Sequence, residues 1–403
     1  MPIEELLALT KKQFQKQNPS SEMEFLLAKD EPAANGLLID NPLMEYLLDR
    51  RFLAYGRFYL LYGKKGSSKT SLFYDLAKTF QKQGGDVIWI ETENAIDLDY
   101  AKKQGVDMNK MALMHPSSIE EALTLAEGII RNMPKAYPDG KTPVLVCLDS
   151  IAGSSTEYEL DTSHSVRDVK LGEHARLLSR FYREMERPLA KERVIFLALN
   201  QLKEKIGGMS FGEEPPDSML GGNAPLFHST YQWKIARTKD LVFETENKQK
   251  IKIGSKHKVT CKRNKLGKEG NSQFIEFDLY IEGGIDWYGP LVRMLSQYFP
   301  HVVSSEGAGW YQWQVPGIKY VDAAGATVEI NTETKFRESD LAKILKISDD
   351  AKHLIREEFK LPPLPAEKVI TELENARLTK RKAKKALGED DGVSRLVDGD
   401  TTE

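Results

Sequence analysis

Short, continuous apolar runs recur through the middle of the chain and alternate with longer segments whose apolar residues have helical spacing. Residues 144–148 and 194–199 are uninterrupted apolar runs, which are typical of strands buried on both faces of a parallel sheet. Residues 118–132 and 172–187 carry the helical pattern between such runs. This alternation predicts an α/β fold with a mostly parallel central sheet covered by helices. The strands expected in the sheet are residues 57–62, 86–91, 144–149, 194–200, 231–236, 258–262 and 274–281.

The pattern changes at both ends of the chain and divides it into four parts. Residues 1–35 form a small N-terminal element with a short amphipathic helix and a strand candidate at 23–28. Residues 36–295 form the core, and residues 296–365 form a small C-terminal α/β region that ends in a proline-rich segment. Residues 366–403 comprise a helix, a basic run and an acidic tail, which has little to bury and is expected to be disordered.

The composition is that of an ordinary water-soluble protein. Of 403 residues, 40% are hydrophobic and 29% are charged, no apolar run reaches membrane-spanning length, and the N-terminus lacks the segments of a signal peptide. Cys147 and Cys261 lie in apolar strands, where we expect them to be reduced and buried, as in the cytoplasm. The net charge of −3 argues against a uniformly basic nucleic-acid-binding protein and is compatible with local basic patches.

A glycine- and lysine-containing segment joins the first core strand to a helix. It runs Gly63-Lys64-Lys65-Gly66-Ser67-Ser68-Lys69-Thr70, and Ser71 follows. The order of strand, glycine-rich turn, Lys-Thr and helix predicts a loop whose backbone N–H groups surround nucleotide phosphates. Lys69 would reach the β- and γ-phosphates, and Thr70 would offer its hydroxyl to Mg²⁺. The motif expects glycine where this chain has Ser68, and an ordinary polar surface turn is the alternative.

Polar residues at the ends of other strands could complete such a site. Asp149 ends an apolar strand and could hold Mg²⁺ next to Thr70. Glu91 and Glu93 share one alternation phase at the end of another strand, where an acid could prepare a water molecule for attack on a phosphate. Gln201 follows a further strand and could hydrogen-bond a γ-phosphate. For Glu91 and Glu93 the alternative is a solvated pair, for Asp149 it is an ordinary strand end, and for Gln201 it is a helix cap or turn residue.

These segments occur in the order of one family. The chain resembles the RecA-type recombinases and looks like a divergent member, with the phage-encoded branch as one candidate. The resemblance covers residues 36 to about 310 and implies a RecA-like P-loop ATPase core. The segments that carry it are Glu91-Thr92-Glu93-Asn94-Ala95-Ile96-Asp97, Asn200-Gln201-Leu202-Lys203-Glu204-Lys205-Ile206-Gly207, Gly221-Gly222-Asn223-Ala224 and Glu282-Gly283-Gly284-Ile285-Asp286-Trp287-Tyr288-Gly289.

The resemblance implies a site for ATP and Mg²⁺. The residues that it assigns to nucleotide binding are Gly63, Lys64, Lys65, Gly66, Ser67, Ser68, Lys69, Thr70, Ser71, Asp97 and Tyr100. Asp97 and Tyr100 would contact the adenine, and Thr70 and Asp149 would hold the metal.

The resemblance also assigns the catalytic residues. They are Glu93, Lys69, Gln201, Arg263 and Lys265. Glu93 would activate the attacking water, and Gln201 would sense the γ-phosphate and order a DNA-binding loop. In this family ATP lies between protomers, so Arg263 and Lys265 would reach the neighbour's nucleotide. A solvated basic turn is the alternative for these two cations.

Contacts to DNA are implied in the same way. The residues are Arg176, Ser179, Arg183, Ile206, Met209, Phe211, Gly221, Gly222, Asn223 and Arg237. Helical spacing places those between 176 and 183 on one face, which would follow a phosphate backbone or, alternatively, pair with acids. Ala236 stands where the family has a second arginine beside Arg237.

The function implied is that of an ATP-dependent strand-exchange recombinase. It would form helical filaments on single-stranded DNA, pair it with homologous duplex DNA and act in recombination and repair. Residues 1–35 would pack on the next protomer, and single-strand-binding and loader proteins would be further partners. The expected location is the bacterial cytoplasm or nucleoid, or the host cytoplasm for a phage protein. The alternatives are a ring-forming motor of the same fold, such as a helicase, and a mediator without ATPase activity. The family's C-terminal duplex-binding domain is not recognisable in the sequence beyond residue 311.

Overall fold

The computed structural model describes residues 3–19, 35–93, 96–163, 172–202, 219–245, 247–267 and 273–361. The chain divides into two units, residues 1–34 with 363–403, and residues 35–362. In the first unit the described part contains α1 (Ile3–Gln17), in which no residue is buried. The expected strand at 23–28 and the expected helix, basic run and tail of 366–403 lie outside the described residues.

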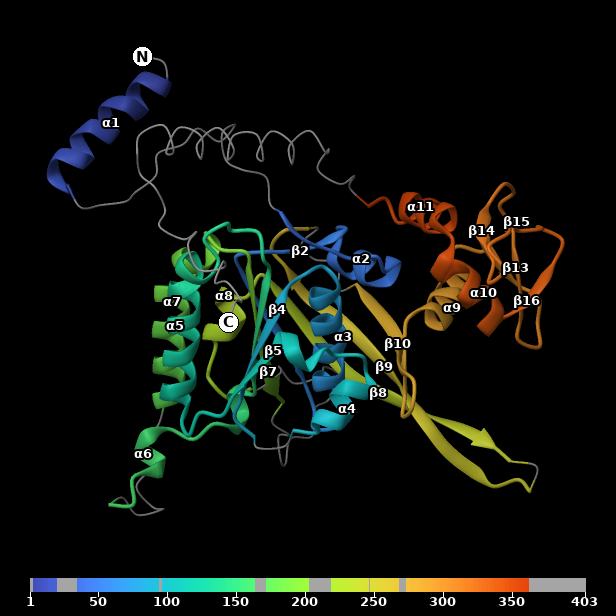
Figure 1. Cartoon of the computed structure of the whole chain (residues 1–403), viewed down its shortest axis with the longest axis horizontal. Helices are drawn as coiled ribbons and strands as arrows, with labels where there is room; N and C mark the ends of the chain where they lie inside the picture. The colour runs from blue at the N-terminus through green and yellow to red at the C-terminus, as the bar shows by residue number, and fades with distance from the viewer. Residues whose placement is uncertain are drawn as a thin grey trace, which may run out of the picture. The chain divides into compact units, whose positions relative to one another are not determined.

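The second unit is built on a nine-stranded sheet with the order β11-β10-β9-β8-β3-β7-β6-β4-β5 (Figure 1). The strands are β3 (Arg57–Gly63), β4 (Asp86–Glu91), β5 (Met111–Met114), β6 (Val144–Asp149), β7 (Val194–Gln201), β8 (Tyr231–Glu244), β9 (Lys250–Asn264), β10 (Phe274–Tyr280) and β11 (Gly284–Asp286). Neighbours from β8 to β5 are parallel, whereas β8 to β11 are antiparallel to one another. The predicted α/β fold with a mostly parallel central sheet is confirmed, and each expected strand is present.

The apolar runs of the sequence are the buried strands in the middle of this sheet. Every residue of β6 is buried, and so is every residue of β7 except the last. Successive side chains of β3 point to opposite faces and enter two separate cores. Tyr59 and Leu61 belong to one core, and Phe58, Leu60 and Tyr62 belong to the other.

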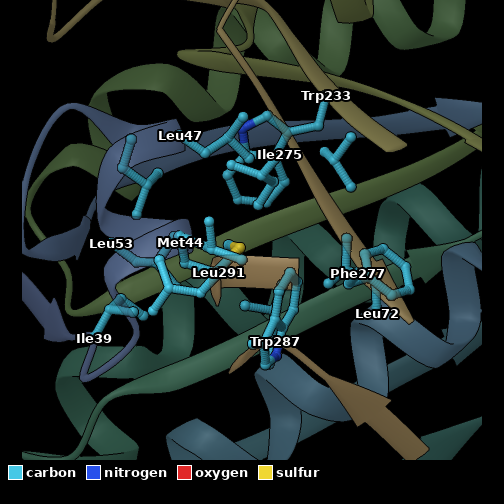
Figure 2. Packing of buried hydrophobic residues seen from close by; sticks show 14 of the residues in the cluster. Ile39, Met44, Leu47, Leu53, Leu72, Trp233, Ile275, Phe277, Trp287 and Leu291 are labelled. Atoms are coloured by element: carbon cyan, nitrogen blue, oxygen red, sulfur yellow. The ribbon is translucent and has the colours of Figure 1, made fainter. Parts of the chain in front are cut away.

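Helices cover both faces of the sheet (Figure 1). The first core takes side chains from α2 (Pro42–Leu48), α3 (Lys69–Lys82), α4 (Leu98–Lys103) and α9 (Tyr288–Tyr298), and Figure 2 shows part of it around Trp233, Phe277 and Leu291. The second core takes side chains from α5 (Ile119–Ala136), α7 (Glu173–Ala190) and α8 (Ala224–His228). Other short elements are β1 (Gly36–Leu38), β2 (Phe52–Ala54) and α6 (Glu157–Leu160). Within the residue ranges that the structure describes, no helix has the length and apolarity needed to cross a membrane.

β8 and β9 continue past the rest of the sheet as a long antiparallel hairpin (Figure 1). Strands were expected at 231–236 and 258–262, but β8 extends to Glu244 and β9 begins at Lys250. The added residues are mostly exposed, so they lack the buried-face alternation by which a strand is recognised in sequence. Cross-strand pairs such as Phe243 with Ile251 hold the hairpin together.

The residues beyond 302 share the first core with the sheet. They form a three-stranded antiparallel sheet, a hairpin and two helices, namely β12 (Val303–Ser305), β13 (Trp310–Trp313), β16 (Lys335–Arg337), β14 (Lys319–Val321), β15 (Thr327–Glu329), α10 (Glu338–Ile347) and α11 (Asp349–Glu358). Trp313, Leu341 and Ile355 are fully buried in that core. Arg356 of α11 donates two hydrogen bonds of 2.7 Å to the buried carboxylate of Glu45 in α2. A buried carboxylate needs such a partner, so this ion pair fixes α11 against α2.

Candidate nucleotide and DNA site

The segment between β3 and α3 is a tight loop at the carboxyl ends of the parallel strands. At Gly63, a Cβ atom would lie 2.3 Å from the carbonyl oxygen of Ile235 in β8, so only glycine fits there. α3 begins at Lys69 and is 14 residues long. The first N–H groups of a helix have no intrahelical partner and attract anions. The loop therefore delivers backbone donors and a helix N-terminus to one point, as phosphate binding requires.

Ser68 stands where the motif expects glycine, and its backbone explains that expectation. Its φ and ψ are 69° and 35°, in the left-handed region. Glycine enters this region freely, whereas other L-residues pay about 1–2 kcal/mol. The chain thus keeps the loop conformation with a residue that disfavours it.

Lys69, Thr70 and Asp149 lie together beneath the loop. Lys69 is buried, and its Nζ donates to the carbonyl oxygens of Gly63 at 3.4 Å and Lys64 at 3.3 Å. Burial lowers the pKa of Lys69, although the negative charges of Asp149 and Glu93 act in the opposite direction. The Oγ1 of Thr70 donates to Oδ2 of Asp149 at 3.1 Å. The predicted phosphate and metal residues are therefore adjacent.

Asp149 is a buried carboxylate in negative surroundings. Burial and the charge of Glu93 raise its pKa to about 7, while Thr70 and Lys69 oppose the rise. A site that disfavours its own negative charge in this way favours a bound cation. Mg²⁺ commonly takes one or two protein ligands and fills its other positions with water and phosphate oxygens. The Thr70 hydroxyl and the Asp149 carboxylate fit that pattern, and the described residues contain no group of three or more His, Cys, Asp or Glu that could hold a metal.

The substitution Asp149→Asn is expected to stabilise the protein in the absence of metal and nucleotide. The pKa of Asp149 in the folded protein, about 7, lies above the ordinary value of 3.8. The contribution of this carboxyl group to the unfolding free energy is therefore fully present below pH 3.8 and is lost as the pH rises through 7. The variant escapes this loss, and its unfolding free energy at pH 8 should exceed that of the wild type by roughly 2–4 kcal/mol. Denaturant unfolding at pH 4 and pH 8 measures the difference. An equal effect at both pH values would contradict a destabilising charge on the Asp149 carboxylate.

Glu93 connects the ends of three parallel strands. It follows β4, and its Oε1 accepts hydrogen bonds from Nε2 of Gln201 at 2.7 Å, at the end of β7, and from Oγ of Ser150, after β6. At Gly153, a Cβ atom would lie 2.5 Å from Cγ of Glu93, so a glycine there makes room for this side chain. Glu91 has a different place, because it is buried and accepts the backbone N–H of Glu93 at 2.9 Å. Glu93 is thus the acid that meets Gln201, and Glu91 supports it.

Two polar residues beside these acids were not among the predicted site residues. Ser150 follows Asp149 directly, and that adjacency was the signal that could have included it. His115 lies with Nδ1 at 3.2 Å from Oε2 of Glu91. His115 follows the four-residue strand β5, which is too short to be recognised by its period.

Asp97 and Tyr100, the predicted adenine contacts, lie at the start of α4. Oδ1 of Asp97 accepts the backbone N–H of Tyr100 at 2.8 Å and so caps the helix. The Tyr100 ring packs against Tyr74 of α3, with ring centroids 6.1 Å apart. The structure brings these residues next to the helix of the phosphate loop, and their contact with adenine stays a prediction. Asn94 and Ala95 lie outside the described residues.

Arg263 and Lys265, at and just after the end of β9, contact α8 of their own chain. Arg263 donates to the carbonyl oxygen of Leu226 at 3.3 Å. Lys265 donates to the carbonyl oxygens of Phe227 at 2.7 Å and His228 at 3.3 Å. Carbonyls at the end of a helix have no partner inside it, and cations are favourable there. Reach of these cations to a neighbouring protomer stays a prediction.

The exposed side of α7 carries Arg176, Ser179 and Arg183. Arg176 and Arg183 are exposed, and Nε of Arg183 donates to the carbonyl oxygen of Ser179 at 3.1 Å. Arg180 is paired with Glu184 at 2.8 Å. The helix therefore combines a basic face with one acid-paired arginine.

The second predicted DNA loop begins and ends at a closed neck. Nδ2 of Asn200 donates to the carbonyl oxygen of Leu220 at 2.9 Å, and an isolated β-bridge joins Leu202 to Met219. The loop that this neck closes begins after Leu202, the direct neighbour of Gln201. Both of its ends therefore lie beside the residue that hydrogen-bonds Glu93.

The glycines that follow the neck lie against α7. At Gly221, a Cβ atom would meet Cδ1 of Leu178 at 2.4 Å, and at Gly222 it would meet Cβ of Ala175 at 2.9 Å. The next residue, Asn223, precedes α8. On the β8–β9 hairpin, Arg237 forms an ion pair with Asp240. The other predicted DNA residues, Ile206, Met209 and Phe211, lie outside the described residues.

Comparison with known proteins identifies the family. The family model of the RecA N-terminal domain matches residues 44–286. The chain is 30% identical over 258 residues to the protein RecA of Paramagnetospirillum magneticum, which is 64% of this chain and 66% of that protein. It is 31% identical over 258 residues to the RecA of Gluconobacter oxydans and 30% identical over 259 residues to the RecA of Listeria welshimeri, in each case over 64% of this chain and 68% of the relative. The match to this last relative, like the others, spans about two thirds of its length. The chain therefore belongs to the RecA family of recombinases.

Proposed function

We propose that the chain is an ATP-dependent DNA strand-exchange recombinase that assembles into helical filaments on single-stranded DNA. The hydrogen bond of 2.7 Å between Glu93 and Gln201 carries this proposal. It links Glu93, the acid suited to activate water, with Gln201, which lies at the start of the neck of the DNA loop. A change in the bonding of Gln201 at the γ-phosphate would therefore act directly on that loop.

The phosphate chemistry follows from the residues around the loop. The N–H groups at the start of α3 and the Lys69 ammonium would bind the β- and γ-phosphates. Thr70 and Asp149 would hold Mg²⁺, which when bound neutralises charge on the phosphate oxygens. Glu93 would accept a proton from the attacking water, since its carboxylate is exposed and fixed by Ser150 and Gln201.

Assembly would complete the site from a second protomer. Arg263 and Lys265 would leave the carbonyls of α8 and contact the γ-phosphate held by the neighbour. Because α8 follows Gly221–Asn223 directly, release of its carbonyls would also reach the DNA loop. Single-stranded and homologous duplex DNA are the proposed partners, with ATP and Mg²⁺ at each protomer interface.

Two measurements on the purified wild-type protein test this proposal. ATP hydrolysis should rise when single-stranded DNA is added, and electron microscopy with ATP and single-stranded DNA should reveal helical filaments. Transfer of a labelled strand between single-stranded and homologous duplex DNA would establish strand exchange itself. Closed rings would instead support the motor, and filaments or complexes without any ATP turnover would support the mediator.

A further inference from the structure

A buried histidine lies directly behind the phosphate loop. His257, on β9, has no exposed surface. Its Nε2 lies 2.8 Å from Oγ of Ser255 and 3.3 Å from Oγ of Ser68. Its ring stacks on Phe277, which Figure 2 labels, with centroids 5.0 Å apart and an interplanar angle of 12°. The imidazole is therefore fixed in orientation, with one nitrogen directed at the loop.

The conformation of Ser68 is unfavourable unless a contact of its side chain stabilises it. Its left-handed backbone is unfavourable for a residue with a side chain, and its hydroxyl makes no capping bond to α3. The hydroxyl contact with His257 is the one that the structure shows for this side chain in the described part of the chain. Ser68 also directly precedes Lys69, so its φ and ψ set the direction of the first peptide groups of α3.

We propose that His257 is a positioning residue for the phosphate loop. It hydrogen-bonds the Ser68 hydroxyl, holds Ser68 in the left-handed conformation, and thereby keeps the loop N–H groups and Lys69 in the arrangement that binds phosphate. This inference rests on the proposed binding of ATP.

The environment of His257 suits this role. Burial lowers the pKa of its imidazole to about 4, so the ring is neutral at ordinary pH. A neutral ring can hydrogen-bond hydroxyl groups without placing a positive charge in the core. Glycine at position 68 would reach the same backbone conformation without any hydroxyl contact. The importance of His257 should therefore depend on which residue stands at 68.

That dependence can be tested with five variants. The variants are Ser68→Ala, Ser68→Gly, His257→Leu, His257→Gln and the double variant Ser68→Gly/His257→Leu. For each, the ATP affinity in the presence of Mg²⁺ and the KM and kcat of DNA-stimulated hydrolysis are measured, with thermal unfolding in parallel. Gln can place an amide nitrogen near the position of Nε2, whereas Leu keeps the volume and removes the hydrogen bond.

Ser68→Ala and His257→Leu should each raise KM by about three- to tenfold, the range expected for one lost hydrogen bond. The change in KM should exceed the change in kcat. Ser68→Gly should have a lower KM than Ser68→Ala, because glycine needs no help in this conformation. The double variant should resemble Ser68→Gly, and His257→Gln should resemble the wild type.

Two outcomes would overturn the inference alone. One is equal KM for Ser68→Ala and the wild type, which removes the role of the hydroxyl even if the His257 variants fail to fold. The other is an equal loss when His257→Leu is introduced into the wild type and into the Ser68→Gly variant, which would mean that His257 acts only through packing. A wild-type protein that binds no ATP would overturn the proposed function together with this inference.

Discussion

The substitution Lys69→Ala is expected to reduce DNA-stimulated ATP hydrolysis by about a thousandfold, the upper end of the loss that follows removal of one transition-state donor. The ammonium group is buried next to the carbonyls of Gly63 and Lys64. From there it can stabilise the negative charge that develops on a transferred phosphoryl group. Steady-state hydrolysis with saturating single-stranded DNA and Mg²⁺ measures the effect.

The fold should survive this change. Burial lowers the pKa of Lys69, which means that its surroundings disfavour the charged form, so the alanine variant should unfold at the wild-type temperature or above it. Lys82→Ala is the matched control, because Lys82 is an exposed lysine in the last turn of the same helix. Turnover above a tenth of the wild-type rate in the Lys69 variant would exclude the assigned role.

The substitution Glu93→Gln is expected to lower kcat by about 10²–10⁴-fold, the usual contribution of a positioned general base. Glutamine keeps the length of the side chain and an oxygen that can accept from Gln201, but it cannot take a proton from water. ATP binding should therefore persist, and filaments formed with ATP should last longer than those of the wild type. Rapid-quench hydrolysis and filament lifetime on single-stranded DNA measure the two effects.

Glu127→Gln serves as the control, since Glu127 is a partly exposed acid of α5 that pairs with Arg131. It should leave kcat and filament lifetime unchanged. A Glu93→Gln variant with kcat within tenfold of the wild type would mean that another group prepares the water.

The fold was largely predictable because buried parallel strands have an unmistakable composition. The runs that became β6 and β7 contain almost no polar residue before their last positions, and the structure buries them on both faces. β1 and β5 were missed because three or four residues are too few to establish a period. The outer half of the β8–β9 hairpin was missed because cross-strand pairing, rather than burial, holds it in place.

The structure brings several of the predicted site residues together, but the sequence did not predict all of their contacts. Lys69, Thr70 and Asp149 come together as expected, and so do Glu93 and Gln201, because the carboxyl ends of adjacent parallel strands meet at one edge. The sequence alone does not show which residues of a distant strand contact the phosphate loop. The contact of Ser68 with His257 is an example, since 189 positions separate the two residues along the chain.

The burial of Trp313, Leu341 and Ile355 in the same core as the large sheet limits how this protein can evolve. The segment from β12 to α11 is therefore not an independent domain that could be replaced by an unrelated one. A replacement would have to offer the same apolar face and a cation for the buried Glu45. Inward positions of this segment must therefore change together with α2, while its outward positions are free to drift.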